Sequence, residues 1–200
     1  MKTLRLSTLT LALSLLTLSA CVDTTGLSPD SKRTARGNPD APVVVQEFAD
    51  LQCPACAAAQ DQIVKPLLEK YGQQVRFELH HYPLQSMHRY ARDLGEAAEC
   101  AADQGKFWEF VDLAFENQKD LAKGIWSKWA ASLKLDTALF DRCVASHIKR
   151  KTVLTDYEQG GKIGVQGTPT FMVNGTKVKA TINDISGAID QLMGQFKTNL

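Results

Sequence analysis

The sequence predicts one α/β domain whose mixed sheet is interrupted by a long helical insertion. Three observations lead to this fold class. An apolar run at 43–48 has the composition of a strand and leads into a Cys-X-X-Cys pair that opens a helical pattern. Residues 75–81 alternate as a half-buried strand does. Near the C terminus, Asn174-Gly175 is a strong hairpin signal between two further strands. The predicted order is β-α-β, a helical block, then β-β-α.

The first β-α-β unit takes its boundaries from composition. The strand at 43–48 is followed by a predicted helix from Ala55 to about Tyr71. Pro66 lies inside this helix and is expected to bend or break it, because proline lacks an N–H and clashes with the preceding turn.

The insertion, from about 86 to 162, has helical spacing throughout. The side chain of Asp136 is a candidate N-cap for one of its helices. The basic run at 149–151 is most simply a solvated helix start. The predicted helices cover residues 91–102, 107–115, 125–133, 137–147 and 149–163.

Two strands and a helix complete the domain. The strands are predicted at 170–173 and 177–181, on either side of the Asn-Gly turn. The last helix, about 183–196, is amphipathic, because Ile185, Ala188, Ile189 and Leu192 recur on one face.

The Cys53-Pro54-Ala55-Cys56 motif indicates disulfide chemistry because of where it lies. A CxxC alone also serves zinc sites and structural thiols, but here it stands between a strand and a helix. Free N–H groups and the macrodipole at a helix N-terminus favour an anion, so Cys53 is expected to be a reactive thiolate. Cys56, one turn further on, is placed to resolve a mixed disulfide. Pro54 suits the first helical position.

The N-terminus indicates export. Lys2 and Arg5 precede an apolar stretch at 6–18, which is too short to span a bilayer comfortably and predicts a signal peptide over 1–20. Leu-Ser-Ala-Cys at 18–21 resembles the bacterial lipobox, which implies cleavage before Cys21 and attachment of lipid to it. The alternative is an ordinary signal peptide followed by an incidental cysteine.

The mature chain from Cys21 would have 180 residues, with 21 Lys and Arg against 22 Asp and Glu. This near-neutral balance gives no indication of nucleic-acid binding. Residues 21–37 are polar and without apolar period, and we expect them to form a flexible tether, with no structure before about Asn38.

Five cysteines divide into one lipid site, one CxxC pair, and Cys100 with Cys143. An even remainder in an exported protein predicts a disulfide between the last two. The alternative is two separate buried thiols.

Five segments together resemble the DsbA-like thioredoxin family, in its bacterial exported and lipoprotein members. They are Gly-Asn-Pro-Asp-Ala-Pro at 37–42, Glu47-Phe48, the CxxC at 53–56, Gln-Gly-Lys-Phe-Trp at 104–108 and Gly-Thr-Pro-Thr at 167–170. The resemblance implies a thioredoxin-like domain from 38–84 and 150–200, with 85–149 as an inserted helical domain. No cofactor is expected. His80 and His81 could join the CxxC as zinc ligands, but they lie on opposite faces of one strand, and two intact thiols in an exported protein favour disulfide chemistry, so no metal is expected.

The family resemblance also assigns roles. It implies a cis-proline at Thr168-Pro169 that faces the CxxC and presents the Thr168 backbone to an extended substrate. It implies that Glu47, six residues before Cys53, is a buried acid that accepts a proton from Cys56. The alternatives are a trans proline entering an edge strand and a solvated glutamate.

The expected function is that of a lipid-anchored thiol–disulfide oxidoreductase in the bacterial cell envelope. Oxidation of cysteine-containing exported polypeptides, with regeneration by a quinone-linked membrane partner, is favoured, and the protein is expected to be a monomer. The alternatives are a reductase or isomerase, and a non-enzymatic peptide-binding chaperone or metallochaperone. His88 and His147 are expected to be ordinary surface histidines.

Overall fold

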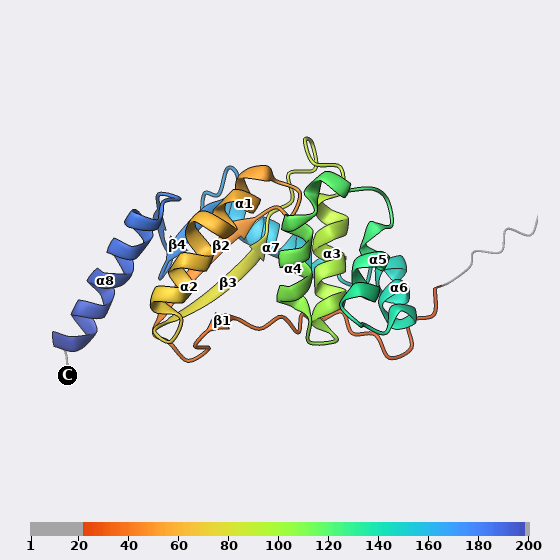
Figure 1. The fold of residues 1–200 in the computed structure, drawn as a ribbon, viewed down its shortest axis with the longest axis horizontal. Helices are drawn as coiled ribbons and strands as arrows, with labels where there is room; N and C mark the ends of the chain where they lie inside the picture. Colours follow the sequence, from red (N-terminus) through yellow and green to blue (C-terminus); the bar gives the residue numbers. More distant parts are fainter. Residues whose placement is uncertain (1–21, 199–200) are drawn as a thin grey trace, which may run out of the picture.

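The computed structural model describes residues 22–198, so the expected signal peptide and Cys21 lie outside the described residues. A five-stranded sheet in the order β1-β3-β2-β4-β5 forms the centre of the thioredoxin-like half (Figure 1). The predicted thioredoxin-like fold is confirmed. The strands are β1 (Arg36–Gly37), β2 (Val43–Ala49), β3 (Val75–His81), β4 (Thr170–Val173) and β5 (Thr176–Val178).

Strand β2 lies at the centre of the sheet, parallel to β3 and antiparallel to β4. Alternate residues of β2 therefore face opposite sides. Val43 and Val45 face a core made with the helices at 54–71 and α8 (Ile182–Thr198), while Phe48 faces α7 (Arg150–Lys162). Glu47 shares the side of Val45, and this places a carboxylate beneath the helix that carries the CxxC.

The helix after β2 starts one residue earlier than predicted and accommodates Pro66 without a break. It consists of α1 (Pro54–Ala59), a π-helical turn (Gln60–Val64) and α2 (Lys65–Tyr71). In the π turn the Lys65 N–H donates to the carbonyl of Gln60, five residues back. The wider turn just ahead of Pro66 changes the local hydrogen-bond register, and the helical path continues through the proline.

The helical block consists of α3 (Ala91–Ala102), α4 (Phe107–Glu116), a 3₁₀ turn (Gln118–Asp120), α5 (Ile125–Ser132) and α6 (Thr137–Ser146). Its apolar core also includes Leu51, Cys53 and Cys56, so the block packs directly against the CxxC. Cys100 in α3 and Cys143 in α6 are joined by a disulfide, with their Cα atoms 5.9 Å apart. Asp136 caps α6 by accepting from the Leu139 N–H at 3.0 Å.

The N-terminal arm, residues 22–37, differs from the expected flexible tether. Figure 1 shows it running along the helical block to β1, which pairs antiparallel with β3. Arg33 reaches Glu99 and Asp156, and the Trp108 indole N–H donates to the Thr34 carbonyl at 2.8 Å. These partners lie 66 to 123 residues away, which explains why local polarity suggested a tether.

Two boundaries near the C terminus also differ. Strand β5 ends at Val178 rather than 181, and α8 starts at Ile182 and extends to Thr198. Within residues 22–198, no helix is long and apolar enough to cross a membrane.

Candidate active site

Cys53 is the N-cap of α1, with extended backbone angles, and Pro54 occupies the first turn. The Cys56 and Ala57 N–H groups both point back to the Cys53 carbonyl, at 3.1 Å each. The Cys53 residue is 7% exposed and Cys56 is fully buried, so an incoming sulfur can meet only the first of the two.

The environment of Cys53 strongly favours its thiolate. The pKa of the Cys53 thiol is lowered to about 5, chiefly by its hydrogen bond with the Cys56 side chain, while partial burial opposes the shift. Thr168 and the N–H groups of Cys56 and Ala55 add to this lowering of the pKa. Burial, the Cys53 interaction and the nearby Glu47 charge raise the pKa of the Cys56 thiol.

Glu47 is completely buried beneath the two cysteines. Burial raises the pKa of its carboxyl to about 8, against the lowering effects of a Gln60 hydrogen bond and the Arg36 charge. The Gln60 amide donates to Glu47 Oε2 at 3.2 Å, whereas Oε1 has no partner among the described residues. A carboxyl in this state can hold or release a proton near neutral pH.

The Thr168–Pro169 peptide bond is cis and lies against the CxxC. The Cys53 thiol donates to the Thr168 carbonyl at 3.7 Å. The Thr170 hydroxyl donates to the Gly167 carbonyl at 2.8 Å and so closes the loop in front of β4. The segments at 53–56 and 167–170, which are 115 residues apart, therefore form one site.

The loop that leads into the CxxC is held by residues that the sequence did not reveal. Asp50 is buried and accepts from the Gln52 N–H, the Leu84 N–H and a ring nitrogen of His88, the last at 2.7 Å. The Gln118 amide donates to the carbonyls of Leu51 and Cys53 at 3.1 and 3.0 Å.

The expectation that His88 is an ordinary surface residue is therefore wrong. No local pattern predicts its contact with Asp50, because the two residues are 38 positions apart. A signal for Gln60 did exist: it follows Cys56 by four residues, which places it one turn on, on the same helix face.

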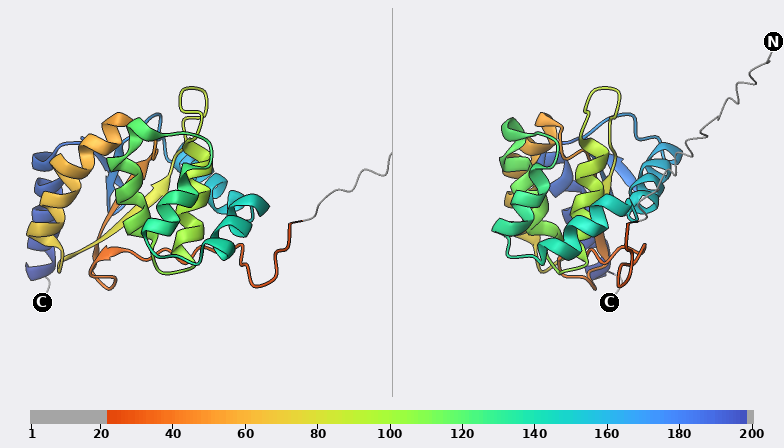
Figure 2. Two further views of the ribbon diagram at one scale, coloured as in Figure 1. Left: turned by 45° about the vertical axis from the view of Figure 1, so that its right-hand side comes forward. Right: turned by 90° about the vertical axis from the view of Figure 1, so that its right-hand side faces the viewer.

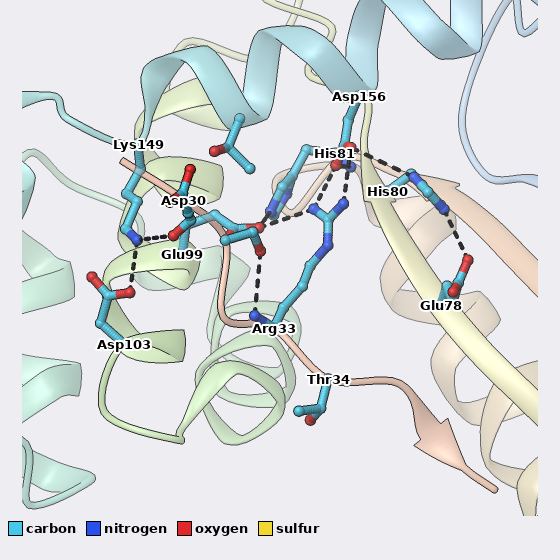
Figure 3. A network of polar contacts seen from close by, with 12 residues as sticks. Asp30, Arg33, Thr34, Glu78, His80, His81, Glu99, Asp103, Lys149 and Asp156 are labelled. Carbon is cyan, nitrogen blue, oxygen red and sulfur yellow. Dashed lines mark hydrogen bonds and ion pairs between the residues drawn. The ribbon is translucent and has the colours of Figure 1, made fainter. Parts of the chain in front are cut away.

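A second buried polar cluster, here called the arm network, lies away from the cysteines (Figure 3). Arg33 donates to Glu99 at 2.9 Å and to both oxygens of Asp156 at 2.5 and 2.9 Å. His81 lies 3.2 Å from Glu99, and His80 lies 3.5 Å from Asp156. Burial acts to raise the pKa values of Glu99 and Asp156, but their charged and hydrogen-bonding partners outweigh it and lower both.

Lys149 extends the arm network and corrects the expectation of a solvated helix start at 149–151. Its side chain has no exposure, and its ammonium group donates to Asp103 at 2.7 Å and to the Asp30 carbonyl at 2.6 Å. His147 also has a specific partner, Glu96, at 2.7 Å. Among residues 22–198, no group of three or more His, Cys, Asp or Glu side chains is arranged to hold a metal ion.

With this geometry in place, comparisons with known proteins assign the family. The family model described as "Thioredoxin" matches residues 30–191. The chain belongs to the thioredoxin family. Within that family it is 30% identical over 171 residues to the probable disulfide bond formation protein D of Bacillus cereus, covering 80% of this chain and 79% of that one.

Solved thioredoxin-family structures agree with the fold. The oxidised BdbD of Bacillus subtilis superposes with a TM-score of 0.70 at 25% identity, covering 80% of this chain and 92% of that one. The α-DsbA1 of Wolbachia pipientis has a TM-score of 0.72 at 20% identity, covering 86% and 95%. The chain is thus a DsbA-like member of the thioredoxin family.

Longer relatives contain a similar segment. The Na(+)/H(+) antiporter NhaA 3 of Salinispora tropica is 39% identical over 142 residues, which are 71% of this chain. The chain spans only about a fifth (22%) of the length of that protein. The likeness therefore concerns one part of that longer protein.

Proposed function

We propose that this protein is an exported thiol–disulfide oxidoreductase that forms disulfides in other polypeptides. The observation that carries the proposal is that the pKa values of the two thiols are shifted in opposite directions. The Cys53 pKa is lowered to about 5, while the pKa of the buried Cys56 is raised. A stabilised Cys53 thiolate favours the reduced enzyme, and a dithiol whose reduced form is stabilised is a strong oxidant. The name of the Bacillus cereus relative, a probable disulfide bond formation protein, supports the same direction.

The proposed reaction starts from the Cys53–Cys56 disulfide. A substrate thiolate attacks the Cys53 sulfur, the Cys53–Cys56 bond breaks, and Cys56 leaves as a thiolate. Because its pKa is raised, Cys56 takes up a proton, and Glu47 is the neighbouring acid that supplies it. A second substrate thiolate then attacks the substrate sulfur of the mixed disulfide and releases Cys53 as a thiolate. The substrate is oxidised by two electrons and the CxxC is reduced.

Substrate is proposed to bind in extended form beside Thr168 and Pro169. The Thr168 carbonyl lies 3.7 Å from the Cys53 sulfur, so a chain paired with this backbone would bring its cysteine to the nucleophile. Proline at 169 offers no N–H that would compete for the thiolate.

The location and partners are also proposals. The lipobox-like sequence ending at Cys21 supports anchoring of a monomer to a bacterial membrane outside the cytoplasm. A quinone-linked membrane protein would reoxidise the CxxC. Replacing Cys21 with alanine should move the protein from the membrane fraction to the soluble fraction, and continued membrane association would contradict the anchor.

The function is tested by following thiols in a reduced, unfolded substrate mixed with the oxidised protein. We expect fast loss of substrate thiols with the wild type and none above background with Cys53→Ser, because the reactive sulfur is absent. Cys56→Ser cannot form the Cys53–Cys56 disulfide, so it is tested with a substrate that already contains a disulfide: the Cys53 thiolate attacks it, one substrate sulfur leaves as a thiolate, and the mixed disulfide should accumulate because no second thiol resolves it. Equilibration with glutathione gives the direction: a potential of about −120 mV supports an oxidase, and one of about −270 mV would identify a reductant instead.

A further inference from the structure

The docked arm sharply limits how far the folded domain can move from an anchor at Cys21. Asp23 already pairs with Arg142 of α6 at 2.9 Å. Such a surface pair contributes little free energy on its own. Leu27, however, packs against the apolar core of the helical block, and the Thr152 hydroxyl donates to the Pro29 carbonyl at 3.1 Å.

The free length of the anchor is therefore short. Leu27 follows Cys21 by only six positions, a reach of at most about 20 Å when fully extended. A tether free to residue 37 would have reached roughly 55 Å. The arm also approaches from one end of the molecule, that of α5 and α6, with the β5 and α8 end opposite (Figures 1 and 2).

The segment that forms the end at which the arm begins is rich in Lys and Arg. Residues 121–151, which comprise α5, α6 and the start of α7, hold seven Lys and Arg against two Asp, a net charge of +5. Three of these cations pair with acids from outside this range: Arg142 with Asp23, Lys149 with Asp103 and Arg150 with Glu96.

Several of these cations are exposed and unpaired. Lys123, Lys128 and Lys151 are exposed, and no carboxylate of residues 22–198 lies within ion-pair distance of them. Beside them, a cavity of about 390 Å³ is lined by Lys123, His147 and Arg150, among other residues. Two acids also line it: Asp93, and the buried Glu96, which lies 2.7 Å from His147 and 3.1 Å from Arg150.

We propose that this basic end, formed by α5, α6 and the start of α7, rests on an anionic lipid bilayer and holds the CxxC in a fixed orientation to it. The proposal rests on the lipid anchor proposed above. The two observations act together: the docked arm brings this end to the membrane, and the exposed cations meet the negative surface potential of anionic headgroups. An active site held in this way would react with polypeptide cysteines that lie at one fixed distance from the membrane surface.

The test places the lipid-modified full chain in liposomes and asks which end touches lipid. A photo-crosslinking residue, p-benzoylphenylalanine, replaces Ala145 in α6 or Ala180 beyond β5, both of which are exposed. In liposomes of phosphatidylglycerol and phosphatidylcholine, we expect at least about five times more lipid adduct from position 145 than from position 180. Equal adducts from a liposome-bound protein would overturn the proposal.

Matched charge variants measure how much attraction between the lysines and the anionic bilayer contributes, apart from the contribution of the docked arm. Lys123→Gln with Lys151→Gln should lower the adduct at position 145 about twofold or more. Lys177→Gln with Lys179→Gln, which removes the same charge at the opposite end, should leave it unchanged. Liposomes of phosphatidylcholine alone, which carry no net charge, should lower the adduct at position 145 of the unsubstituted lysine background to the same extent as Lys123→Gln with Lys151→Gln. Adducts that are insensitive to both lipid charge and the first pair would overturn the role of the basic end.

A twelve-residue Gly/Ser insertion between Val22 and Asp23 tests the short anchor. At 0.5 M NaCl, where charge attraction is screened, the native chain should keep its preference for position 145, and the insertion should abolish it. An unchanged preference would contradict the role of the arm. Failure of the anchor itself would look different, because every variant would then be absent from the liposome fraction.

Discussion

Glu47 and Glu99 are both fully buried carboxylates, yet their surroundings shift their pKa values in opposite directions. Beneath the cysteines, Glu47 has a neutral amide as its hydrogen-bond partner, and burial raises its pKa to about 8. In the arm network, Glu99 is contacted by Arg33 and His81, and its pKa is lowered. Burial is common to both, so the charge of the partner decides whether a buried acid exchanges protons or holds a permanent charge.

The largest effect expected from this difference follows removal of the cation from the arm network. Arg33→Ala leaves Glu99 and Asp156 buried without their main counter-charge, and breaking a buried pair in this way costs about 3–5 kcal/mol. Urea unfolding should show this loss of stability. The absorbance of the Cys53 thiolate in the surviving folded protein should titrate as in the wild type.

Arg36→Ala is the matched control within the arm. Arg36 pairs with the partly exposed Asp112 and lies over the Trp108 ring, with its guanidinium carbon 4.4 Å from the ring centroid. A partly solvated contact of this kind should contribute about 1 kcal/mol or less. If Arg33→Ala and Arg36→Ala lowered the free energy of unfolding equally, the buried arm network would contribute no more to stability than a partly solvated ion pair.

The next effect concerns Glu47→Gln and has a defined pH dependence. Between about pH 4.5 and 8 the folded wild type keeps the Glu47 proton that the unfolded chain has released, so this group lowers stability as pH rises. The substitution removes that slope and should stabilise the protein by about 3 kcal/mol at pH 7 relative to wild type, with little gain at pH 4.

This measurement should use the oxidised protein, in which neither active-site thiol titrates. In the reduced form the lowered pKa of Cys53 would add stability with rising pH and hide the effect. Glu99 and Asp156 give the opposite signature, since their lowered pKa values add stability above the unfolded pKa, which is lost as pH falls to acid values. A wild type and a Glu47→Gln variant with parallel stability curves from pH 5 to 8 would contradict the raised pKa.

The smallest effect is expected from Gln60→Leu. Losing the amide hydrogen bond to the Glu47 carboxylate should raise the Glu47 pKa further by about one to two, because a hydrogen bond to a charged group contributes about 1.5–3 kcal/mol. The carboxyl ¹³C shift of Glu47 followed against pH by NMR measures this directly. A downward shift would mean that the amide presents its oxygen to the carboxyl instead.

Sequence patterns were sufficient wherever the signal was local. The strand before the CxxC, the helix after it and the Asn-Gly hairpin each depend on neighbouring residues, and each lies within a few residues of its expected place. The cis bond at Pro169 and the Cys100–Cys143 pairing agree with expectations from family resemblance and from cysteine parity.

The features that sequence missed depend on partners distant in the chain. Arg33 finds Asp156 across 123 positions, and Gln118 holds the Cys53 carbonyl across 65. Both are polar side chains in segments with no apolar period, and nothing in such a segment indicates whether it meets solvent or a buried counter-charge. The same limit applies to His88 and Lys149, for which the sequence predicts solvent-exposed positions.

Strand β1 has a practical consequence for where this domain begins. A gene trimmed to start at the first long strand would encode the CxxC, the cis-proline and every helix, yet its product would lack Arg33 and the short strand that pairs with Arg76 and Phe77 of β3. That product would expose further unpaired backbone groups at this edge of the sheet, where other chains can add. Recombinant versions that begin after residue 37 should therefore precipitate, whereas those that begin at residue 22 should stay monodisperse.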